Sequence, residues 1–243
     1  MQQMPCLREF PVLKTERLTL RGLVPEDQAG VFAIYSNPEV TRFCDVATLA
    51  NHQQASALIQ VFQAEVEKDA GLRWAITQKG SPQLIGLCGV GWYRHNASAL
   101  LSYDLNQDYW NRRIMTEAVQ AVVKYVFDHA GTNRITATTT VDNAASMRVL
   151  QHAGFREEGI LREWGFWKGE FKDLRCFSLL RKDTPPASPP TGSAAVLANP
   201  CGGQESGGCT RPLTSVKAGF AENPAAPYEW AGTKPPTLIR SGR

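Results

Sequence analysis

The sequence lacks the long apolar segments that carry a chain into or across a membrane. Its first ten residues contain no apolar core of signal-peptide length, and no uncharged run approaches the roughly 18 residues that a membrane-spanning helix needs. We therefore expect a cytoplasmic protein that does not associate with membranes.

The sequence also lacks a large excess of charge of one sign, and its potential metal ligands are not clustered. The 26 basic and 23 acidic residues leave a net charge of only +3, which is too small to indicate nucleic acid as the partner. The six cysteines and four histidines are scattered, without the close pairs that form zinc sites. We expect free thiols, no metal and no nucleic-acid partner.

Proline is scarce until near the end of the sequence. Ten of the fifteen prolines follow residue 183, together with the glycine-rich stretch Cys201-Gly-Gly-Gln-Glu-Ser-Gly-Gly-Cys209. Such a composition does not easily form helices or paired strands. We predict a folded domain over residues 14–183 and a disordered tail over residues 184–243.

Before residue 184, apolar residues recur at the spacings of helices and strands. Leu58, Ile59 and Phe62, for example, are spaced so that they share one face of a helix. Predicted helices cover 25–35, 51–68, 116–129 and 144–152, and predicted strands cover 17–22, 73–78, 84–93, 97–105 and 134–141, with two more at the end. This order predicts an α/β (α+β) fold, in which helices flank a central sheet.

A basic turn joins the fourth predicted strand to the next helix. It reads Asp108-Tyr-Trp-Asn-Arg-Arg-Ile-Met-Thr-Glu-Ala118. The first amides of a helix have no partner within the helix and lie at the positive end of its dipole, so they bind anions such as a pyrophosphate. We interpret this turn as a site for coenzyme A. The alternative is a pair of arginines on a solvated helix start, without a ligand.

A second motif begins a later helix. Asn143-Ala-Ala-Ser146 leads into a helix that ends His152-Ala-Gly154-Phe155. An asparagine in this position is an ordinary N-cap, because its side chain satisfies a free amide of the first turn whether or not a ligand is present.

Together, these motifs and the segment Glu158–Asp173 resemble the GCN5-related N-acetyltransferases (GNAT), and most of all the RimJ/RimL-like branch, which acetylates ribosomal-protein N-termini. The resemblance spans residues 13–182. It implies the GNAT fold, with a central mixed, mostly antiparallel sheet. It also implies an enzyme that transfers acetyl from acetyl-CoA to a primary amine, of a protein N-terminus or a small molecule, by direct attack in a ternary complex.

The resemblance also implies which residues hold the cofactor. In this family the splayed end of a central strand binds the pantetheine arm through its main chain, and the turn binds the pyrophosphate. The corresponding residues here are Tyr103, Asp104 and Leu105 on the strand, and Trp110, Asn111, Arg112, Arg113, Ile114, Met115 and Thr116 in the turn.

Asn111 and Arg113 depart from the family pattern, which usually has glycine at both positions. A side chain in an unfavourable backbone conformation costs about 1–3 kcal/mol, whereas Arg112 and Arg113 add charge that can contact phosphates. We expect weakened coenzyme A binding. A degenerate relative that keeps the fold as a binding module, with weak or no catalysis, is the alternative function.

For catalysis, the resemblance implies that Asn143 touches the cofactor and that Ser146 protonates the departing thiolate. Many members use a tyrosine one turn later, where this sequence has Leu150. Direct attack on a thioester also needs a group that polarises the carbonyl, for which a main-chain amide near Leu105 is a candidate, and a proton acceptor. Three carboxylates remain open as that acceptor: Glu117, Asp104 and Glu163.

The acceptor cleft is predicted near the last two strands. Glu163, Phe166 and Trp167 are the candidate substrate residues, because the resemblance places one wall of the cleft there. Strand alternation would bury some of these aromatics for packing alone, which is the alternative. The identity of the amine depends on residues 36–50 and 158–172, and a monomer and a homodimer both remain open.

Overall fold

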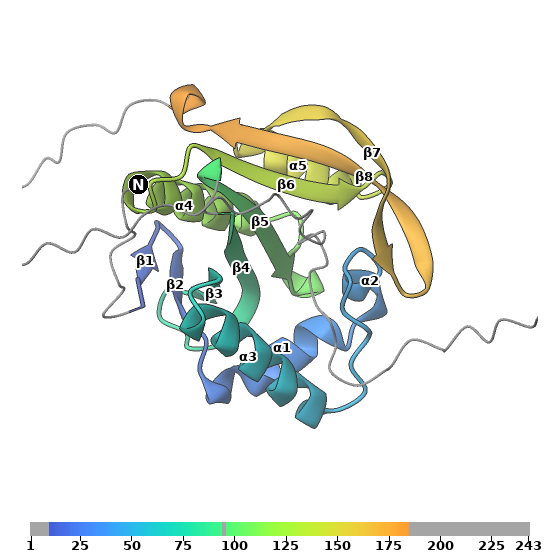
Figure 1. Ribbon diagram of the computed structural model, residues 1–243. Coiled ribbons are helices and arrows are strands. Elements are labelled where there is room, and N and C mark those ends of the chain that lie inside the picture. The colour runs from blue at the N-terminus through green and yellow to red at the C-terminus, as the bar shows by residue number, and fades with distance from the viewer. Residues whose placement is uncertain (1–9, 94–95, 185–243) are drawn as a thin grey trace, which may run out of the picture. The chain divides into compact units, whose positions relative to one another are not determined.

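A single mixed sheet of eight strands organises the described part of the chain. The computed structural model describes residues 10–93 and 96–184, and the predicted tail lies outside them except for Thr184 (Figure 1). The strands are β1 (Leu13–Lys14), β2 (Leu18–Gly22), β3 (Gly71–Gln78), β4 (Leu84–Tyr93), β5 (Ser98–Leu105), β6 (Arg134–Thr140), β7 (Arg156–Trp167) and β8 (Glu170–Leu180). Their order is β1-β2-β3-β4-β5-β6-β8-β7, and every neighbouring pair is antiparallel except β5 and β6. The predicted fold class is confirmed.

Five α-helices and three short 3-10 helices accompany the sheet in these residues. They are η1 (Pro25–Asp27), α1 (Gln28–Tyr35), α2 (Pro38–Thr41), α3 (His52–Glu67), η3 (Gln107–Tyr109), α4 (Ile114–His129), α5 (Ala144–His152) and η4 (Arg181–Asp183). None of the described helices is long and apolar enough to cross a membrane. α4 begins two residues before the predicted start at 116, and the four-residue helix α2 and the two-residue strand β1 were not predicted.

Helices cover both faces of the sheet. On β3, the Trp74 ring packs edge-on against Tyr125 of α4, with ring centroids 5.7 Å apart. The neighbouring Arg73 places its guanidinium 4.1 Å from the ring centroid of Phe62 on α3. Because successive side chains of a strand point to opposite faces, α3 and α4 lie on opposite sides of the sheet. β3 and β4 are therefore almost continuously buried, as their apolar sequences require.

The sheet opens between β5 and β6. β5 pairs with β4 along its whole length, but with β6 only at Ser98, Ala99 and Leu100. Beyond Leu100 the two strands diverge, as Figure 1 shows, and β6 continues in register with β8. Residues 101–105 thus have a ladder partner on one side only among the described residues. We call this opening the splay.

Candidate active site

The main chain of β5 directs hydrogen-bonding groups into the splay. The Asn106 amide donates to the Ile85 carbonyl of β4 at 2.9 Å. Main-chain groups on an antiparallel strand alternate between its two sides, so those of Asp104 also face β4, whereas those of Tyr103 and Leu105 face the splay. The splay is therefore lined by a strand edge that can bind an extended ligand through its main chain.

The turn after β5 keeps a left-handed backbone at both positions where the family pattern has glycine. Asn111 has φ 60°, and Arg113, the N-cap of α4, has φ 58° and ψ 14°. L-residues visit this region at a cost of about 1–2 kcal/mol, and asparagine does so more readily than arginine. Both positions therefore have backbone angles that favour glycine, and the strain is greater at Arg113 than at Asn111.

Six consecutive amides of this turn point to no acceptor. From Asn111 to Thr116, no main-chain N–H donates a hydrogen bond to any residue that the structure describes, whereas the next amide, of Glu117, donates to the Arg113 carbonyl at 3.1 Å. The side chains of Ile114 and Met115 are buried in the core, so these two residues offer a ligand only their amides. The positive end of the α4 dipole adds to the same site, which suits a diphosphate.

A clamp from the β1–β2 region holds the turn in place. The Glu117 carboxylate accepts hydrogen bonds from the Thr15 hydroxyl at 2.5 Å, the Arg17 amide at 2.9 Å and the Arg17 guanidinium at 2.7 Å. The same guanidinium donates to the Arg112 carbonyl at 3.1 Å. Although burial acts to raise it, these hydrogen bonds hold the pKa of Glu117 below its ordinary value. This arrangement favours a role in positioning the turn over a role as proton acceptor.

Trp110 and Arg112 tie the turn to its surroundings. The Trp110 indole donates to the Leu105 carbonyl at 2.9 Å, which fixes the end of the splayed strand to the start of the turn. The Arg112 guanidinium lies 5.5 Å from the ring centroid of Tyr109. Arg112 and Arg113 are both exposed, so their charged ends are accessible beside the free amides.

Across the splay, α5 presents Asn143 and Ser146. The Asn143 side chain accepts from the Ser146 amide at 3.0 Å and so caps the helix, as predicted. The Ser146 hydroxyl lies 2.7 Å from the Tyr103 hydroxyl of β5, and either can be the donor. Leu150, one turn further along, is fully buried in the core.

Asp104 points to the other face of the sheet, toward α1. Its carboxylate accepts a hydrogen bond from the Tyr35 hydroxyl at 2.7 Å. Burial raises the pKa of Asp104 above its ordinary value, against the opposing effects of the Tyr35 hydrogen bond and the Arg73 charge. Asp104 is thus a carboxyl group beside the splay whose proton affinity is increased.

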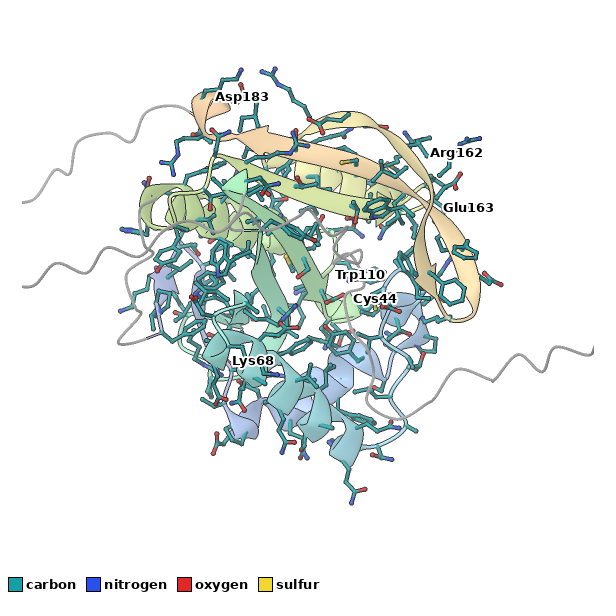
Figure 2. All side chains as sticks on the ribbon, viewed as in Figure 1. Cys44, Lys68, Trp110, Arg162, Glu163 and Asp183 are labelled. Carbon is teal, nitrogen blue, oxygen red and sulfur yellow. The ribbon has the colours of Figure 1, made fainter. Side chains whose placement is uncertain are left out.

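Beyond the last β6 partner, Leu174, the strands β7 and β8 continue as a hairpin arm, residues 162–173. Figure 2 shows Glu163 at the bend of this arm, pointing outward next to Arg162. Glu163 is exposed, has φ 51°, and its amide donates to the Asp173 carboxylate at 2.8 Å. Phe166 is 60% exposed, and its ring centroid lies 4.7 Å from that of Phe171, with the two ring planes tilted by 50°. Trp167 packs over Gly165, so a Cβ at that glycine would lie 2.2 Å from the tryptophan ring.

The tip of the arm contacts the end of α2. The Lys168 ammonium donates a hydrogen bond to the Thr41 carbonyl at the end of α2. Arg42, the next residue, forms an ion pair with Asp142 of the β6–α5 loop at 3.5 Å. The sequence alone indicated neither contact, nor the Arg17 clamp, because each pairs side chains that lie far apart along the chain.

The described residues contain no cluster of side chains that could bind a metal ion. No group of three or more histidine, cysteine, aspartate or glutamate side chains there has the arrangement of a metal site. Of the six cysteines, Cys44, Cys88 and Cys176 lie in the described part of the chain, and all three are free thiols. Burial raises the pKa of Cys44 and of Cys88 to about 12, so both thiols stay protonated near neutral pH.

Comparisons with known proteins show which family this chain resembles. The acetyltransferase (GNAT) domain family matches residues 17–156. The uncharacterized N-acetyltransferase YoaA of Bacillus subtilis is 34% identical over 173 residues, which cover 71% of this chain and 98% of that protein. The uncharacterized N-acetyltransferase p20 of Bacillus licheniformis is 33% identical over 172 residues, or 70% of this chain and 97% of that protein.

A solved structure shares the fold. Mycobacterium smegmatis RimJ, solved in complex with CoA-disulfide, superposes with a TM-score of 0.65 at 20% identity, and the match covers 76% of this chain and 92% of that one. The GNAT family, which the sequence resemblance predicted, is confirmed, and RimJ shares the fold of this chain. The chain therefore belongs to the GNAT family of acetyltransferases.

Proposed function

We propose that the protein transfers an acetyl group from acetyl-CoA to a primary amine, of a protein N-terminus or a small molecule, in a ternary complex in the cytoplasm. The observation that carries the proposal is the row of six free amides from Asn111 to Thr116, next to the splayed edge of β5. The amides bind the diphosphate, and the main chain of Tyr103 and Leu105 binds the pantetheine arm. This arrangement brings the thioester into the splay, between β5 and α5.

The transfer itself needs few protein groups. The amine nitrogen attacks the thioester carbonyl, and the Leu105 amide, which faces the splay, polarises the carbonyl oxygen. Asp104 accepts the proton from nitrogen, directly or through water, because it adjoins the splay and its pKa is raised. Of the other two candidates, Glu117 already accepts three hydrogen bonds in the clamp and Glu163 points outward.

The acceptor enters on the face of the sheet that carries α1 and α2. The contact of Lys168 with Thr41 joins the arm to α2, and the aromatic side chains of the arm, Phe166 and Trp167, form the outer part of this entrance. Glu163 contributes charge at its rim. The amine therefore approaches Asp104 from the side opposite to Ser146.

The experiment is calorimetric titration with acetyl-CoA, followed by an assay of thiol release with a panel of amines and N-terminal peptides. Charge reversal by Arg112→Glu places a negative group beside the diphosphate and should weaken binding roughly tenfold or more. The matched control is Lys68→Glu at the end of α3, which should bind normally. Absence of heat at about millimolar acetyl-CoA in the unaltered protein overturns the proposal.

A binding module without catalysis is the second candidate function. The observation that favours it is the strained backbone at Asn111 and Arg113, because a glycine-free turn binds phosphates less closely. The thiol-release assay separates the two functions: binding without turnover across the amine panel supports the module, whereas turnover that falls in Ser146→Ala supports the enzyme.

A further inference from the structure

Two hydroxyl groups meet at the wall of the splay that α5 forms. Tyr103 projects from β5 toward the same face as Cys88 and Trp74, its neighbours across the sheet. Its phenol oxygen lies 2.7 Å from the Ser146 hydroxyl and 3.2 Å from the Ser146 carbonyl oxygen. Ser146 is the residue whose amide the Asn143 side chain binds, so the serine backbone is fixed.

The number of protons limits how this pair can bond. Each hydroxyl has one proton, and the carbonyl can only accept. If the phenol donates to the carbonyl, the serine proton is directed at the phenol oxygen. If the phenol donates to the serine oxygen, the serine proton is free for a third group.

A negative charge in the splay selects the second arrangement. A thiolate attracts the serine proton, and the serine oxygen then accepts the phenol proton, so both hydroxyls align toward the sulfur. Hydrogen bonds in such a chain polarise and strengthen one another, and those to an ion are the strong ones. Burial raises the pKa of Tyr103 well above its ordinary value, so the phenol remains a donor throughout.

We propose that Tyr103 is a positioning residue, whose hydroxyl turns the Ser146 proton toward the sulfur that leaves acetyl-CoA. The inference rests on the proposed function. The C–N bond forms as the C–S bond breaks, and the electron pair of that bond goes to sulfur. The nitrogen releases one proton to Asp104, and the thiolate later takes up one from solvent. The two hydroxyls supply hydrogen bonds and no net proton.

The first test needs no acceptor. The ultraviolet absorbance of the thiolate reports the thiol pKa of CoA bound to the protein. A hydrogen bond that stabilises the thiolate lowers this pKa, so Tyr103→Phe, which removes only the hydroxyl, should raise it by about one unit while CoA affinity stays within about twofold. Tyr125→Phe removes a phenol from α4, away from the splay, and serves as the matched control.

The outcomes of this test are distinct. If CoA binds and its thiol pKa is the same in the unaltered protein and in Tyr103→Phe, the positioning role is overturned while the proposed function stands. If CoA does not bind at all, the proposed function fails first. If Tyr125→Phe raises the thiol pKa of bound CoA as much as Tyr103→Phe does, the inference is also overturned. The change would then follow from the loss of any phenol hydroxyl and would not be specific to Tyr103.

The second test uses turnover. We expect Tyr103→Phe to lower kcat about 10- to 100-fold with little change in the KM for acetyl-CoA, since the hydrogen bond to sulfur forms only as charge develops. Because the tyrosine acts through the serine, Tyr103→Phe should cost nothing further in a Ser146→Ala background and should still cost activity in Ser146→Thr, which keeps a hydroxyl. The proposal would be contradicted if Tyr103→Phe lowered kcat equally in the Ser146→Ala and Ser146→Thr backgrounds, or if it changed only the KM.

Discussion

Glycine at position 113 should make the protein more stable than alanine at that position. Arg113 holds φ 58° at the start of α4 and its side chain is exposed, so little packing is lost with it. The left-handed backbone costs about 1–2 kcal/mol for a residue with a Cβ, and glycine avoids this cost. Glycine also gains about 0.5–1 kcal/mol of conformational freedom in the unfolded chain, which opposes the effect. The free energy of unfolding should therefore rise by about 0.5–1 kcal/mol in Arg113→Gly, relative to Arg113→Ala.

The assay is urea denaturation of the full chain, with thermal melting as a second measurement. The expected gain corresponds to a rise in Tm of about 1–4 °C for a domain of this size. Lys124 supplies the matched control, because it lies in the middle of the same helix with its side chain 67% exposed. There glycine should be less stable than alanine by about 1 kcal/mol. If glycine is the less stable residue at both positions, the argument from strain at Arg113 is refuted.

Three further predictions concern the site. Glu117→Gln should weaken CoA binding several-fold by calorimetry, because it loosens the clamp. The pKa of Glu117 is lowered on folding. The stability that its carboxylate contributes should therefore be full at neutral pH and lost as the pH falls through the pKa of Glu117 in the folded protein. Asp104→Asn should lower kcat by about 100-fold with acetyl-CoA affinity unchanged, and in the unaltered protein kcat/KM should increase as the pH rises through the raised pKa of Asp104. Gly165→Ala should displace Trp167 from the arm, increase its fluorescence response to solvent quenchers and raise the KM of the acceptor more than that of acetyl-CoA.

Each of these predictions can fail in a recognisable way. Stability of Glu117→Gln that follows the same pH dependence as the unaltered protein would show that the clamp carboxylate is not the group that titrates. Full activity in Asp104→Asn would return the role of proton acceptor to another group. Unchanged quenching of Trp167 in Gly165→Ala would mean that the arm accommodates the added methyl group without moving the ring.

Local signals in the sequence predicted much of the fold. Asn51 and Asn143 cap α3 and α5 because their side chains accept from an amide three residues later, which is a short-range pattern. The apolar periodicity of α3 and the uninterrupted apolar run of β4 likewise depend on neighbouring residues only. The four residues of α2 are too few for a periodic pattern, and the start of α4 was missed because Arg113 gives no glycine-like signal there.

Contacts between distant residues could not be predicted in the same way. The clamp joins Arg17 to Glu117 over 100 residues, and Tyr103 meets Ser146 over 43. Each contact depends on the strand register and on the angle of a helix against the sheet, which no single segment determines. The family resemblance pointed to Tyr103 and Ser146 separately, but only the structure brings their hydroxyls together.

The clamp has a practical consequence for anyone who trims this protein. The family match begins at residue 17 and ends at residue 156, so a fragment cut to those limits would omit Thr15, which donates to Glu117, and the whole of β8. The same cut would remove β7 except for Arg156, so β6, which pairs with β8 in the whole chain, would become an unpaired edge of the sheet. Functional expression should therefore start before β1 and extend beyond Leu180.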